Sequence, residues 1–114
     1  MEQLAVFGED VCRSLRRSMV RRNVLLFLWL FQDAATIADI AKGIGSNYTN
    51  VLLAVEGDDD RYAVRLSLIR LGLLERENVV GTLWVYRLTS RGKSAAKKLR
   101  EIGYDLEVRP GQEA

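Results

Sequence analysis

The chain contains no histidine and a single cysteine, Cys12. Without histidine it lacks the commonest general base and the commonest zinc ligand, and the cysteine has no imidazole to activate it. A disulfide within the chain is excluded, which fits a reducing compartment. Gly43 and Gly45 have neither the third glycine nor the preceding strand of a dinucleotide-binding loop. We therefore expect no enzymatic activity, no cofactor and no metal site.

Long hydrophobic runs are also scarce. The longest, residues 24–31, is less than half of the roughly 20 residues that a membrane-spanning helix needs. No secretory cleavage pattern precedes it. The acidic stretch at residues 56–60 lacks the alternating ligands and terminal glutamate of a calcium loop, so helix capping is the simpler interpretation. These features predict a cytoplasmic protein without membrane contact.

Charge is nearly balanced, at a formal net charge of +2, but it is unevenly distributed. Acidic residues concentrate at positions 56–60, whereas basic residues gather near both ends. The basic residues near the ends are Arg13, Arg16, Arg17, Arg21, Arg22, Arg87, Arg91, Lys93, Lys97, Lys98 and Arg100. The net charge is too small to indicate a nucleic-acid partner, so the distribution carries the argument.

The pattern of apolar residues and helix caps predicts a mostly helical chain with one β-hairpin, an α+β fold. Helical spacing runs through residues 1–18, weakened at Gly8, and Ser18 is placed to cap a helix that begins at Met19. Thr36 is expected to cap a further helix, which Gly43 is expected to end. Ser46 or Asn47 then caps a helix over residues 47–56, which Gly57 ends.

The second half contains the predicted hairpin. A packing helix is expected over residues 61–71, with Leu68 and Leu71 facing the core. The segments LLERE and LWVYRL alternate as half-buried strands, joined by a turn at residues 78–82. Thr89 or Ser90 is expected to cap a closing helix with lysines on its polar face.

Three segments resemble small prokaryotic, and in particular archaeal, winged helix-turn-helix transcriptional regulators. They are IADIAKGIGSNYTNV, SLIRLGLLE and YRLTSRGK. The resemblance covers about residues 20–102 and implies a DNA-binding domain with a two-stranded wing. The chain departs from the family because GDDDR interrupts the helix after the turn, which is why we place a separate helix at residues 61–71.

The resemblance implies sites on double-stranded DNA. Base contacts are expected at the start of the second helix of the motif, and phosphate contacts are expected around it and on the wing. The expected base contacts are Asn47, Thr49 and Asn50. The expected backbone contacts are Tyr48, Lys42, Arg61, Arg65, Arg76, Arg87 and Arg91.

A second interpretation remains open, in which the domain docks a protein partner and does not bind DNA. Between Gly43 and Asp60 there is no lysine or arginine, but there are four acidic residues. Asn47, Tyr48 and Asn50 then serve only as a cap and solvated surface. No small-molecule effector is identifiable from the sequence.

The helix beginning at Met19 is apolar on all sides, which suggests that a second subunit covers part of it. The predicted homodimer interface comprises Leu15, Phe27, Trp29 and Phe31. The alternative is a central helix wrapped by its own chain. We divide the chain into a helical extension at residues 1–18, a DNA-binding domain at 19–102 and a loosely ordered tail at 103–114.

Overall fold

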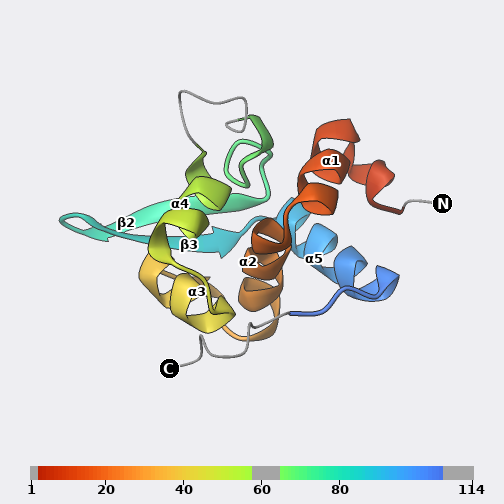
Figure 1. The fold of residues 1–114 in the computed structure, drawn as a ribbon. Helices are drawn as coiled ribbons and strands as arrows, with labels where there is room; N and C mark the ends of the chain where they lie inside the picture. Colours follow the sequence, from red (N-terminus) through yellow and green to blue (C-terminus); the bar gives the residue numbers. More distant parts are fainter. Residues whose placement is uncertain (1–2, 58–64, 107–114) are drawn as a thin grey trace.

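The computed structural model describes residues 3–57 and 65–106 (Figure 1). Over these residues the chain forms five α-helices, a short 3-10 helix and a three-stranded sheet, so the predicted α+β class is confirmed. The elements are η1 (Gln3–Phe7), α1 (Glu9–Arg17), α2 (Met19–Leu30), β1 (Ala34–Ala35), α3 (Ile37–Ile44), α4 (Tyr48–Glu56), β2 (Leu74–Val80), β3 (Leu83–Leu88) and α5 (Ser90–Ile102).

Side-chain caps determine where most of the helices begin. Each cap residue has extended backbone, and its side-chain oxygen accepts a hydrogen bond from the N–H three residues on. Ser18 accepts from Arg21 (3.1 Å), Thr36 from Asp39 (3.1 Å), Asn47 from Asn50 (2.8 Å) and Thr89 from Gly92 (3.0 Å). Asn47 and not Ser46 caps α4, and Thr89 and not Ser90 caps α5.

The end of α3 differs from the prediction. The helix continues through Gly43, and Gly45 ends it in the left-handed conformation with φ 68°. Gly43 has a packing role, because a Cβ atom there would lie 2.2 Å from Cε1 of Phe27. The prediction that Gly43 ends the helix was therefore wrong, since the glycine is needed for the close approach of α2 and not for a turn.

The predicted helix over residues 61–71 is wrong where it can be compared, because residues 65 and 66 are 3-10 helical and residues 67–71 form a bend and turns; residues 61–64 lie outside the described part of the chain. The backbone N–H groups of Leu68 and Ile69 donate to the carbonyls of Ala54 and Val55, each at 3.0 Å. These carbonyls belong to the last turn of α4, which has no partners of its own within the helix. The turns thus complete α4, while Leu68 and Leu71 are buried as expected.

The sheet has the order β1–β3–β2, with both pairs antiparallel. The β2–β3 hairpin follows the predicted strands, with Arg76 opposite Tyr86 and an irregularity between Asn78 and Val80. Its tip projects beyond the body of the molecule (Figure 1). Strand β1 is absent from the predicted elements, because two alanines carry no strand pattern of their own and pair with β3 only through the fold.

Helix α2 runs through the middle of the molecule and contacts α3, α4 and α5 (Figure 1). Residues 24–28 are buried within the single chain, and the fully buried side chains of Leu4, Val11 and Leu15 join the same core from the N-terminal helices. The wrapped-helix alternative therefore describes this part of α2. No helix in residues 3–57 and 65–106 has the length and apolar character needed to cross a membrane.

The segment after α5 is described to residue 106. The N–H of Tyr104 donates to the carbonyl of Leu99 at 2.9 Å, and the guanidinium carbon of Arg22 lies 4.5 Å from the centre of the Tyr104 ring. The rest of the predicted loose tail, residues 107–114, lies outside the described residues.

Candidate nucleic-acid interface

The first turn of α4 forms an exposed polar surface. Helix α3, a short turn at residues 45–47 and α4 follow one another, and Val51 and Val55 anchor α4 in the core. Because these anchors face inward, the preceding turn faces solvent. Its exposed residues are Asn47, Tyr48, Thr49 and Asn50, the residues predicted to meet DNA.

The first-turn side chains differ in how much hydrogen-bonding capacity remains available. The Oδ1 atom of Asn47 already caps the helix, so its amide NH₂ is the free part of the group. The side chains of Tyr48, Thr49 and Asn50 make no hydrogen bond within the described residues. Asn50 is therefore the better placed of the two asparagines for a bidentate contact.

The cations near this turn are few. Lys42 on α3 and Arg65 in the turn after α4 are exposed and have no ion-pair partner among the described residues. Arg61 lies outside the described part of the chain. Near this turn, Lys42 and Arg65 are thus the described cations whose positive charge no carboxylate of the described residues neutralises.

Arg76, on β2, is held within the chain. Its Nη1 lies 2.8 Å from Oε2 of Glu56, the last residue of α4, and its guanidinium carbon lies 4.8 Å from the centre of the Trp84 ring. The Tyr86 hydroxyl donates to the same Glu56 oxygen at 2.8 Å. The Glu56 carboxylate raises the pKa of Arg76, while burial, and then the bond to Glu56, raise the pKa of Tyr86 to about 12.

The two other predicted wing and helix arginines are also engaged. Nη2 of Arg87 lies 2.9 Å from Oε1 of Glu77 on the neighbouring strand. Arg91 donates to the carbonyl of Leu71 at 2.8 Å and to that of Phe7, so it joins the turn before β2 to the N-terminal segment. All three arginines are predicted DNA contacts, and their partners within the chain lie 10 to 84 residues away, too far to be indicated by a local pattern.

The tip of the hairpin is apolar and exposed, and none of its residues is among the predicted site residues. Val79, Val80, Leu83 and Trp84 are 56%, 68%, 45% and 39% exposed, and no charged residue occurs between positions 78 and 86. The signal was present in the uncharged run NVVGTLWVY. It was hidden because the same run also fits a half-buried strand.

The residues predicted to form a dimer interface separate into two groups. Leu15 is fully buried and Phe27 is 8% exposed, so both pack inside the chain and are not available to a partner. Trp29 and Phe31 are 40% and 65% exposed at the end of α2. The difference arises because α3 covers α2 at Phe27 but not one turn later.

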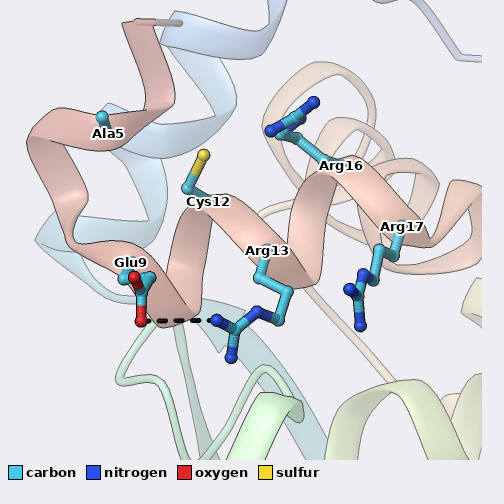
Figure 2. Close-up of a pocket in the computed structure, with 6 residues that line it drawn as sticks. All are labelled: Ala5, Glu9, Cys12, Arg13, Arg16 and Arg17. Atoms are coloured by element: carbon cyan, nitrogen blue, oxygen red, sulfur yellow. Dashed lines mark ion pairs between the residues drawn. The ribbon is translucent and has the colours of Figure 1, made fainter.

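A hollow of about 700 Å³ lies along α1, and three of its six lining residues are arginines: it is lined by Ala5, Glu9, Cys12, Arg13, Arg16 and Arg17. Figure 2 shows Cys12 and Arg16 projecting from one side of α1 and Arg13 and Arg17 from another. Arg13 pairs with Glu9 at 3.3 Å and with Asp10 at 3.7 Å. Among the residues the structure describes, no three histidine, cysteine, aspartate or glutamate side chains gather where a metal ion would be held.

Comparison with known proteins places the chain in a family. The EarA-like family model matches residues 11–99, and the chain belongs to that family. An uncharacterized protein of Methanocaldococcus jannaschii is 31% identical over 104 residues, which cover 90% of this chain and 93% of the relative. No solved structure matches.

Proposed function

We propose that this EarA-like chain is a winged helix-turn-helix protein that binds specific DNA sequences as a homodimer and regulates transcription. The observation that carries the proposal is the first turn of α4, which exposes Tyr48, Thr49 and Asn50 with no side-chain hydrogen bond to residues 3–57 or 65–106. In this assignment α3 and α4 are the two helices of the motif and the β2–β3 hairpin is the wing. A helix with a polar, unengaged first turn matches the way such motifs enter the major groove.

The proposed roles follow from side-chain chemistry. Asn50 pairs bidentately with an adenine, and the methyl group of Thr49 contacts a thymine methyl. The free amide of Asn47 adds a donor at the same edge. Tyr48, Lys42 and Arg65 contact phosphates, which positions the helix and supplies the salt-dependent part of the affinity.

The proposed dimer rests on the exposed end of α2. Trp29, Leu30 and Phe31 are consecutive and are 40%, 38% and 65% exposed. Exposure of such apolar surface to water is unfavourable, so its burial against a partner would lower the free energy. Two-fold pairing of such ends would bury them and present two α4 helices to one duplex. Replacing Trp29 and Phe31 with serine should then yield monomers in sedimentation equilibrium, whereas an unchanged mass would place the dimer contact elsewhere.

A second function, docking to a protein without DNA binding, is favoured by the hairpin. Its apolar tip and its two carboxylate-paired arginines match an apolar partner better than a phosphate backbone. In this alternative the tip residues Val80 and Trp84 provide the contact surface.

One experiment separates the two functions. The purified protein is incubated with a pool of random duplexes across a salt series, and bound duplexes are sequenced. We expect affinity to fall steeply with salt and a subset of sequences to be enriched. No binding at low salt would reject the DNA function and favour the docking alternative. Binding without enrichment would reject sequence specificity.

A further inference from the structure

The last residue of α4 and the middle of β2 are joined by one ion pair on the surface of the proposed wing. Glu56 Oε2 lies 2.8 Å from Nη1 of Arg76, and the side chains are 23% and 47% exposed. The Glu56 carboxylate thus pairs with Arg76, which is the one arginine of β2.

A carboxylate and a phosphate bind an arginine through the same interactions. Both present oxygen acceptors to the fork of guanidinium N–H groups, and both are favoured by its charge. The hydrogen bond of the Arg76 guanidinium to Glu56 uses Nη1 alone, so this bond leaves N–H groups of the fork for a second acceptor. Its stacking on Trp84 keeps the plane of the group oriented when the acceptor changes.

The release of Arg76 would not leave Glu56 without a partner. The Tyr86 hydroxyl donates to the same Oε2 atom at 2.8 Å, and this bond remains when Arg76 moves to another acceptor. A carboxylate that is only 23% exposed and is left without any partner would carry a desolvation cost. Tyr86 removes much of that cost, so the exchange of acceptors is feasible.

We propose that Glu56 occupies the phosphate-binding position of Arg76 in the free protein and yields it to a DNA phosphate when α4 is seated in its target. The inference rests on the proposed DNA-binding function and adds a specificity device to it. In a non-specific complex the phosphate is held too loosely to displace Glu56, so Arg76 keeps its carboxylate partner and adds no attraction. In the specific complex the exchange adds one phosphate contact.

The test replaces Glu56 with glutamine and measures binding to a random-sequence duplex at several salt concentrations. We expect affinity to rise about three- to tenfold at low salt, and the plot of log affinity against log salt to steepen by about one unit. Glu75→Gln is the matched control. Glu75 precedes Arg76 on β2, is exposed and has no ion-pair partner in the described residues, so its removal changes the net charge equally without freeing an arginine.

Arg76→Gln supplies the second measurement, and it does not require a change at Glu56. In the natural background it should weaken specific binding and reduce the salt slope by about one unit while leaving random-sequence binding nearly unchanged. Combined with Glu56→Gln, it should abolish the gain that Glu56→Gln produces alone. Thermal melts of all variants establish that the proteins remain folded.

The outcomes separate this inference from the proposed function. If the natural protein enriches specific duplexes but Glu56→Gln behaves like Glu75→Gln, the exchange is rejected and the DNA function stands. The same holds if Arg76→Gln leaves the salt slope of specific binding unchanged. If the natural protein binds no duplex, the DNA function is rejected and the exchange with it.

Discussion

The first turn of α4 and the base of the β2–β3 hairpin both lie at the surface, but they are held in different ways. Within the described residues, the side chains of the first turn make only the local cap bond of Asn47. The hairpin base is held by contacts that are distant in sequence: Thr89 bonds Gly72, Arg91 bonds Leu71, and Glu56 bonds both Arg76 and Tyr86.

This difference shows which residues remain available for a ligand. Polar side chains on a short local turn keep their donors and acceptors, because no distant element covers them. Arginines at the hairpin, in contrast, lie next to other elements of the same chain and bond to their carboxylates and carbonyls. Substitutions in the hairpin base should therefore affect folding, and substitutions in the first turn should mainly affect binding.

The largest expected effect is at Gly92, beside the hairpin base. A Cβ atom there would lie 1.9 Å from the carbonyl oxygen of Leu73, which also accepts the N–H of Thr89. Because backbone atoms cannot move aside as a side-chain end does, Gly92→Ala should destabilise the protein by about 3 kcal/mol or more. Denaturant unfolding measures this, with Ser94→Ala on the exposed face of α5 as the control, expected within about 0.5 kcal/mol. A cost for Gly92→Ala as small as that of the control would refute the close packing.

The next effect is on binding and concerns the first turn. Asn50→Ala should weaken binding to an enriched duplex by roughly 1–3 kcal/mol, while the salt slope and the free energy of unfolding barely change. Competition titration against random duplex measures the specific loss. Lys42→Gln is the comparison, since a phosphate contact should weaken all sequences alike. An equal loss on random DNA would remove Asn50 from the base-reading set.

Tyr86→Phe tests the hydrogen bond from the Tyr86 hydroxyl to Glu56 at the hairpin base. The raised pKa means that the neutral hydroxyl stabilises the folded state fully below pH about 10 and that this stabilisation is lost as pH rises toward 12. We expect Tyr86→Phe to cost about 1.5 kcal/mol at neutral pH, and the difference from the natural protein to shrink across that window. Denaturant unfolding at several pH values measures it. A difference that stays constant through the window would show that Tyr86 does not titrate late.

The smallest effect concerns the cap. Asn47→Ala removes the acceptor for the Asn50 N–H and should cost about 1 kcal/mol of folding stability. Asn47→Asp keeps an acceptor at this position and should restore most of the loss. Thr49 lies two residues after Asn47 and is exposed, so Thr49→Ala should change the free energy of unfolding by no more than about 0.5 kcal/mol in the same measurement. If Asn47→Ala and Thr49→Ala cost the same, the cap bond does not stabilise α4.

Local elements were predictable from the sequence because their signals are local. Ser18, Thr36 and Gly57 mark helix ends in the sequence and in the structure alike, and the two hairpin strands follow their alternation. The errors arose where a distant element decides the conformation. Gly43 packs against Phe27. The segment at residues 65–71 donates hydrogen bonds to the last carbonyls of α4 and does not form the α-helix that its own pattern predicts.

The candidate site divides along the same line. The composition and position of the polar turn at Tyr48, Thr49 and Asn50 were determined by the sequence alone, because a capped helix with an inward Val51 and Val55 has one possible outer face. Only the tertiary structure decided that Arg76, Arg87 and Arg91 have partners within the chain and that Leu15 and Phe27 are core residues. The physical reason is that ionic and packing contacts depend on separation in space, and a sequence states separation along the chain alone.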